Sequence, residues 1–159
     1  MSKRAKQKRC SPHRQRTIDP MGGLRKLTDR QPMNQNQLTD LGLGYWLAFD
    51  NMLFHASTEY DWNIVTGSLN IGVVMCEEGI NEEALDVFKR ALDASFATRL
   101  RGERTGLWRY AGADIDTIRN ALQIHDQQCA SVTQGRMVKV IYEVQDRVDK
   151  NLVYTEQAI

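Results

Sequence analysis

Apolar side chains recur every three or four residues along most of the chain, and this spacing limits the fold more than any other feature. The first series starts at Leu38 and continues through Leu41, Tyr45 and Phe49 to Met52. A spacing of about 3.6 residues places such side chains on one face of an α-helix. Comparable series predict helices over about 38–56, 62–76, 84–96, 107–129 and 137–148.

Signals for helix ends separate these series. Thr58 is followed three residues later by Asp61, which is a typical capping box at a helix N-terminus. Gly79, Gly102 and Gly135 stand where three series stop, and glycine often ends a helix. Helices joined by short turns pack as antiparallel neighbours. We therefore predict an all-α fold, a compact antiparallel bundle of about five helices.

The charge of the chain is unevenly distributed, although its formal total is only +1. Residues 1–36 hold ten Lys or Arg and two Asp, a net charge of +8, whereas residues 37–159 carry a net charge of −7. The first sixteen residues contain no Leu, Ile, Val or aromatic side chain to bury. We predict a flexible, basic N-terminal arm over 1–36, largely disordered, and a single α-helical domain over 37–159.

The sequence also indicates a compartment. No apolar run approaches the 18–20 residues that a membrane-spanning helix needs, and no apolar stretch follows the basic start as it would in a secretory signal. Cys10, Cys76 and Cys129 are odd in number and widely spaced, which is typical of a reducing compartment. We expect a cytoplasmic location, with no membrane partner.

The basic arm is the strongest functional signal. A run of Lys and Arg without apolar partners attracts phosphate at long range and needs no fixed geometry, although phosphate contacts do not read a base sequence. The alternative is a solubilising tail, or one that folds against the acidic body. The residues predicted to contact nucleic acid are Lys3, Arg4, Lys6, Lys8, Arg9, Arg14 and Arg16.

A second candidate lies between two predicted helices. Arginine mixed with Trp and Tyr is the composition of protein interfaces and of surfaces on which bases stack. The alternative is a helix junction in which Trp108 fills the core. The candidate interface residues are Arg99, Arg101, Arg104, Trp108, Arg109 and Tyr110.

Nothing in the sequence supports catalysis, a cofactor or a metal. Asp126 follows His125 directly, and adjacent helical residues point about 100° apart, so this Asp cannot orient this ring. His125 falls in an apolar series and is interpreted as a core histidine. Cys10 and His13 form a single pair, whereas a zinc site needs two. The glutamates of 77–83 are interpreted as exposed helix-end charges. Since none of these groups indicates catalysis, we predict a protein that is not an enzyme.

One helix pair suggests a different function. Over 65–98 the small residues Gly72, Gly79, Ala84 and Ala91 alternate with large ones as in a tetratricopeptide hairpin. Such proteins need about three repeats, and the chain contains one. The alternative function is therefore a protein–protein adaptor that uses this hairpin, with the basic arm incidental.

The order of several short motifs resembles a group of small uncharacterised proteins carried by proteobacterial phages, prophages and plasmids. The likeness extends from about Ile18 to Val144 and rests on 19–22 (Asp-Pro-Met-Gly), 38–41 (Leu-Thr-Asp-Leu) and 121–126 (Ala-Leu-Gln-Ile-His-Asp). It implies a mobile-element accessory protein in the bacterial cytoplasm and brings no catalytic residues.

The arm and the resemblance together give the leading hypothesis. The expected protein is a non-enzymatic accessory protein that binds nucleic acid or a host nucleoprotein complex. An inhibitor of a bacterial defence system, such as an anti-CRISPR protein, fits this description, and so does a regulator of phage genes.

Overall fold

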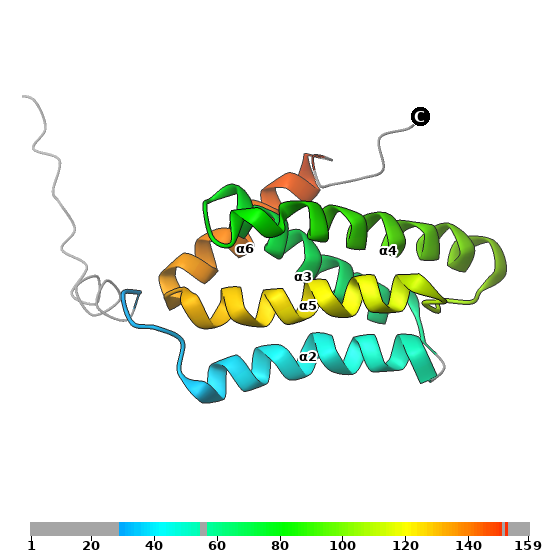
Figure 1. The fold of residues 1–159 in the computed structure, drawn as a ribbon, viewed down its shortest axis with the longest axis horizontal. Helices are drawn as coiled ribbons and strands as arrows, with labels where there is room; N and C mark the ends of the chain where they lie inside the picture. The colour runs from blue at the N-terminus through cyan, green and yellow to red at the C-terminus, as the bar shows by residue number, and fades with distance from the viewer. Residues whose placement is uncertain (1–28, 55–56, 151, 153–159) are drawn as a thin grey trace, which may run out of the picture.

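The structure is a computed structural model that describes residues 29–54, 57–150 and 152. These residues form an all-α bundle of five helices with one short 3₁₀ turn, which confirms the predicted fold class (Figure 1). The elements are α2 (Gln35–Phe54), α3 (Glu59–Glu77), η1 (Glu82–Ala84), α4 (Leu85–Thr105), α5 (Ala113–Ser131) and α6 (Gln134–Asp149).

Helix α3 occupies the centre of the bundle and packs against each of the other four helices. Its apolar residues point in several directions, and Val65, Leu69 and Met75 are fully buried. A helix that is apolar around most of its circumference must be covered on most sides. The sequence of α3 thus explains its central place in the fold.

The hairpin of α3 and α4 is closely packed at Gly72. A Cβ atom placed on Gly72 would lie only 2.1 Å from the ring of Phe88, which is itself completely buried. Because Gly72 has no side chain, the Phe88 ring lies directly against the backbone of α3. This is the close approach that small residues over 65–98 predict.

Two helix ends agree with the sequence signals. The carboxylate of Asp61 accepts a hydrogen bond from the backbone N–H of Thr58 at 2.9 Å, within the predicted capping box. Helix α3 ends at Glu77, and Gly79 follows with a φ of +84°, a conformation that glycine adopts without strain.

Two other predicted ends are wrong. Helix α4 does not stop at Gly102 but continues to Thr105, and Gly106 ends it with a φ of +73°. Gly102 is instead the place where the Trp108 ring covers the helix, since a Cβ there would lie 2.6 Å from that ring. The next helix begins at Ala113, so Leu107 lies in the connection and is 65% exposed.

The first described residues pack against the start of α6. The carbonyls of Asp29 and Gln31 accept hydrogen bonds from the N–H groups of Gly135 and Gln134, both at 3.0 Å. Met33 adds an apolar contact to the smaller core cluster beside α6. Part of the segment that the sequence assigns to the arm therefore belongs structurally to the folded body.

Candidate interaction surfaces

The seven basic residues that the sequence predicts to contact nucleic acid lie outside the described residues. Lys3, Arg4, Lys6, Lys8, Arg9, Arg14 and Arg16 all precede Asp29, the first residue that the structure describes. Their predicted role stays a prediction. What the structure provides is the position of Asp29, at which this segment is covalently joined to the body.

A group of basic residues surrounds that junction. Arg30, Arg136 and Lys139 line a shallow hollow of about 440 Å³ at the start of α6, together with the single acidic side chain of Asp29. Among the described residues, neither Arg30 nor Lys139 forms an ion pair, whereas Arg136 pairs with Glu78 at 2.6 Å. We call Arg30, Arg136 and Lys139 the junction patch.

Side chains alone supply the positive charge of the junction patch. The first N–H groups of α6 are already used by Asp29, by Gln31 and by the hydroxyl of Thr133, which accepts from Arg136 N at 3.3 Å. The helix N-terminus therefore offers no free donors to an anion. Sequence reasoning missed this patch because about one hundred residues separate Arg30 from Arg136.

The segment between α4 and α5 is a structural junction at several of its predicted interface residues. The guanidinium of Arg101 donates to the carbonyl of Arg109 at 2.6 Å. Arg109 in turn donates through Nη2 to the carbonyl of Leu53 at 2.9 Å, at the end of α2. Charged donors on these two carbonyls, one in the α4–α5 connection and one at the end of α2, hold this corner of the bundle together.

The other residues of this segment differ in exposure. Tyr110 is 2% exposed and belongs to the core, and Trp108 is half-buried against Gly102. The guanidinium of Arg99 lies 5.5 Å from the ring centre of Trp62 and pairs with Glu103 at 2.6 Å. Arg104 is exposed. The surface that remains for a partner therefore consists of arginines rather than of Trp108 and Tyr110.

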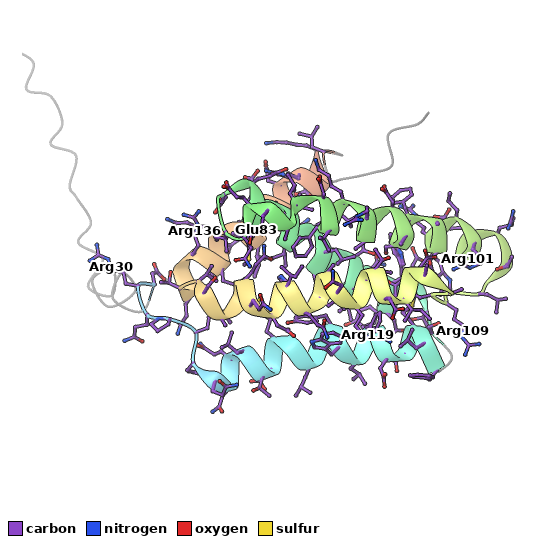
Figure 2. All side chains as sticks on the ribbon, in the orientation of Figure 1. Arg30, Glu83, Arg101, Arg109, Arg119 and Arg136 are labelled. Carbon is purple, nitrogen blue, oxygen red and sulfur yellow. The ribbon has the colours of Figure 1, made fainter. Side chains whose placement is uncertain are left out.

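The two basic regions do not form one surface. Figure 2 shows Arg30 and Arg136 at one end of the bundle and Arg101 and Arg109 at the opposite end. A ligand that contacts the junction patch would have to follow the length of a helix to reach the α4–α5 junction.

His125 is a buried core residue, in agreement with the sequence interpretation. It is 1% exposed, and burial lowers the pKa of its ring to about 4, while the hydrogen bond that Nδ1 donates to Oε1 of Gln128 acts in the opposite direction. Its Nε2 atom lies 3.5 Å from the sulfur of Cys129. Burial also raises the pKa of the Cys129 thiol to about 12, so the pair is neutral at pH 7 and is poorly suited to nucleophilic chemistry.

Asp126 faces away from His125, as the helical geometry predicts. Its carboxylate accepts hydrogen bonds from the hydroxyl of Tyr45 and, at 3.0 Å, from the indole N–H of Trp46. These contacts join α5 to α2 and give Asp126 two structural partners on that helix. Burial, followed by the bond to Asp126, raises the pKa of Tyr45 well above its usual value.

The acidic residues around the α3–α4 turn are partly neutralised by α6. Arg147 pairs with Glu77 at 2.6 Å, and Arg136 pairs with Glu78 at the same distance. No group of three or more His, Cys, Asp or Glu side chains in the described part of the chain could hold a metal ion. The two remaining glutamates of the predicted cluster, Glu82 and Glu83, are exposed.

The outer face of α2 is a further surface, and sequence reasoning did not identify it. Leu43, Leu47 and Phe54 are 62%, 64% and 69% exposed, although they lie on a helix whose other face is buried. They border a groove of about 420 Å³ that also includes Asp50 and, from α5, Arg119. The signal was present in the sequence, since these residues repeat at heptad spacing beside the inner series.

The described helices include none long and apolar enough to cross a membrane. Comparison with known proteins identifies no relative: no family model, no curated protein and no solved structure matches this chain.

Proposed function

We propose that this protein is a non-enzymatic accessory protein of a mobile genetic element that binds nucleic acid or a nucleoprotein complex of its bacterial host. The observation that carries the proposal is the net charge of +8 over residues 1–36, set against −7 over the rest of the chain. Inhibition of a host defence complex and regulation of phage genes are the two roles that such binding would serve.

The junction patch supports this proposal. The basic segment joins the body at Asp29, and the folded residues next to that point are Arg30, Arg136 and Lys139. A phosphate backbone held by the arm would meet further positive charge where the arm ends. Several phosphate contacts in a row are what non-specific nucleic-acid affinity requires.

The acidic body limits where the nucleic acid can bind. Away from the junction patch, the groove between α4 and α5 is lined by Asp93, Asp114 and Asp116 and only one basic residue, Arg90. Such a surface repels phosphate. Binding confined to one end of the molecule fits selective engagement of a complex better than general coating of DNA.

An electrophoretic mobility assay with the full chain tests the proposal. One variant replaces the seven predicted basic residues of the arm by Gln, and a second carries Arg30→Gln and Lys139→Gln. We expect the first to lose most of its affinity for both DNA and RNA. The second should reduce the slope of log K against log salt by about 1–2, since each lost phosphate contact contributes about 0.9.

A matched control carries Lys89→Gln and Arg90→Gln on α4, which removes the same charge from a part of the body outside the junction patch. Equal loss of binding in this control and in the junction variant would show an effect of total charge rather than of a site. Unchanged binding by the arm variant would overturn the proposal.

The alternative adaptor function receives less support from the packing. The α3–α4 hairpin is present, but α3 packs against four helices. The hollow that α3 lines together with Lys89 and Arg147 has a volume of only about 110 Å³. The outer residues of α4 are largely polar or charged, among them Asp86, Arg90 and Asp93. A protein partner would therefore need a surface other than the hairpin.

A further inference from the structure

The outer face of α2 has a regular geometry that the bundle itself does not use. Asp40, Leu43, Leu47, Asp50 and Phe54 follow one another at steps of three, four, three and four residues. This is the heptad spacing at which one helix packs along another. All five residues are exposed, and α2 lies at the edge of the bundle (Figure 1).

The exposed apolar residues on this face are difficult to explain in an isolated molecule. Leu43, Leu47 and Phe54 each expose more than 60% of their surface, and the neighbouring half-buried Trp46 extends the groove. Single exposed apolar residues are common, but three of them on one face of a helix, beside a half-buried Trp, indicate an interaction surface.

Gly44 gives an independent argument. It lies in the interior of α2, where glycine weakens a helix relative to alanine, and a Cβ atom added there would meet nothing within 4 Å. Nothing in the described residues therefore requires glycine at this exposed position next to Leu43. A second helix that approached this face closely would require it, as small residues do where two helix backbones come near each other.

We propose that this face binds a second copy of the chain, with the two α2 helices antiparallel about a twofold axis. In that arrangement Leu43 of one copy lies opposite Phe54 of the other, and Leu47 lies opposite Asp50. A twofold interface must be self-complementary, and each face supplies both a carboxylate, Asp50, and a guanidinium, Arg119, beside the same groove.

The charges at the groove favour this pairing over a partner of one sign. Asp50 forms no ion pair among the described residues. Arg119 pairs with Asp116 of its own helix at 2.6 Å, and its guanidinium carbon lies 5.7 Å from the ring centre of Phe49 on α2 (Figure 2). An antiparallel copy places each Asp50 near the opposite Arg119, so that Asp50 gains a charged partner and Arg119 gains a second one beside Asp116.

The size of the face sets the strength of the dimer. A helix of 20 residues is about 30 Å long and 10–12 Å wide, so its face is smaller than the roughly 800 Å² per partner of a standard stable interface. We therefore expect a dimer that dissociates on dilution into the low micromolar range, rather than a permanent one.

Sedimentation velocity of the full chain, freed of nucleic acid and measured over roughly 1–100 µM, tests the inference. The wild-type protein should shift from monomer to dimer across this range. Leu47→Glu should remain monomeric throughout, because it places a second carboxylate opposite Asp50. The control Leu100→Glu makes the same change at a residue of α4 that is 53% exposed, and it should dimerise normally.

Gly44→Ala separates the interface from the stability of the fold. The added methyl group should raise the melting temperature of the monomer, since it improves the helix and meets no neighbour. It should also weaken dimerisation by about tenfold or more, because it holds the two helices apart.

Several outcomes would overturn the inference. A wild-type protein that stays monomeric at every concentration excludes it, whether the face is covered by another part of the chain or reserved for another protein. Dimerisation that survives Leu47→Glu, or that Leu100→Glu abolishes, places the contact elsewhere. The inference goes beyond the proposed function, and the measurement contains no nucleic acid, so each can fail without the other.

Discussion

At the scale of single residues, the glycines of the bundle have different roles. Gly72 and Gly67 both lie inside α3, yet a Cβ at Gly72 would collide with Phe88, whereas one at Gly67 would meet nothing within 4 Å. The sequence shows both as glycines in a helical series. Only the packing shows that one of them is required.

We expect Gly72→Ala to destabilise the fold by about 1–3 kcal/mol, since Phe88 is fully buried and cannot move aside. Gly67→Ala should instead stabilise it by about 0.5–1 kcal/mol through its higher helix propensity. Urea unfolding of the two variants measures both effects. A similar effect of the two substitutions would mean that helix propensity, and not the contact with Phe88, determines the result.

The buried His125 makes stability depend on pH. Burial lowers the pKa of its ring from 6.5 to about 4, so the unfolded chain binds a proton between these values and the folded protein does not. This contribution to stability is complete above pH 6.5 and is lost as the pH falls toward 4. Between pH 7 and pH 5 we expect the free energy of unfolding to decrease by about 2 kcal/mol from this residue.

Urea unfolding of the wild-type protein and of His125→Gln at both pH values isolates this effect. The other two histidines are present in both proteins, so the difference between the two pH slopes belongs to His125. The variant should show the smaller loss of stability on acidification. Equal slopes would mean that the ring can be protonated without unfolding.

At the scale of elements, the helices could be predicted from periodicity but several of their ends could not. The apolar series predicted five helices because a buried face must repeat with the helix. The same series predict helix ends at Gly102 and Gly135, but both glycines lie inside helices, where the Trp108 ring and the backbone of Asp29 pack against them. A glycine that ends a helix and one that admits a neighbour look the same in a single sequence.

The candidate surfaces also differ in whether the sequence could predict them. The basic arm is a local feature of composition, so the sequence identifies it. The junction patch joins residues that are distant in the chain, and it needs the contact between Asp29 and Gly135 to exist. The burial of Tyr110 in the core also depends on tertiary packing. The residue types of a segment between two helices do not predict such burial.

Among the helices, α6 has the weakest attachment to the bundle. It buries only Met137 and Val140 completely, and of the main helices it packs chiefly against α3. Ion pairs that are partly exposed, such as Arg147 with Glu77, supply much of the remaining contact. Such pairs contribute about 0–1 kcal/mol each, so α6 should open before the core does.

Hydrogen exchange measures this order of opening. The amides of α6 should exchange sooner than those of α3, and Arg147→Gln should accelerate exchange in α6 while leaving α3 unchanged. Lys150→Gln is the control, since Lys150 pairs only with Asp146 of the same helix among the described residues. Uniform exchange across α3 and α6 would mean that the bundle opens as one cooperative unit.

At the scale of the whole molecule, charge and packing divide the chain at different places. The positive charge extends to Arg30, but the backbone contacts of Asp29 and Gln31 with α6 place these residues in the folded body. The side chain of Asn34 also accepts from the N–H of Gln37 at 3.0 Å, and that of Gln37 accepts from Asn34 at 2.9 Å, so the pair caps α2.

We therefore expect two truncated chains to differ sharply in stability. A chain that begins at Asp29 keeps the contacts with α6 and the cap of α2, and its free energy of unfolding should stay within about 1 kcal/mol of the full protein. A chain that begins at Gln37 loses the cap, the two backbone hydrogen bonds and Met33, and it should be less stable by about 2–4 kcal/mol. Thermal and urea unfolding compare the three chains directly. Faster hydrogen exchange at the start of α6 in the shorter chain alone would locate the loss of stability there. Equal stability of the two truncated chains would instead show that residues 29–36 contribute no net stability. The charge boundary would then also be the boundary of the fold.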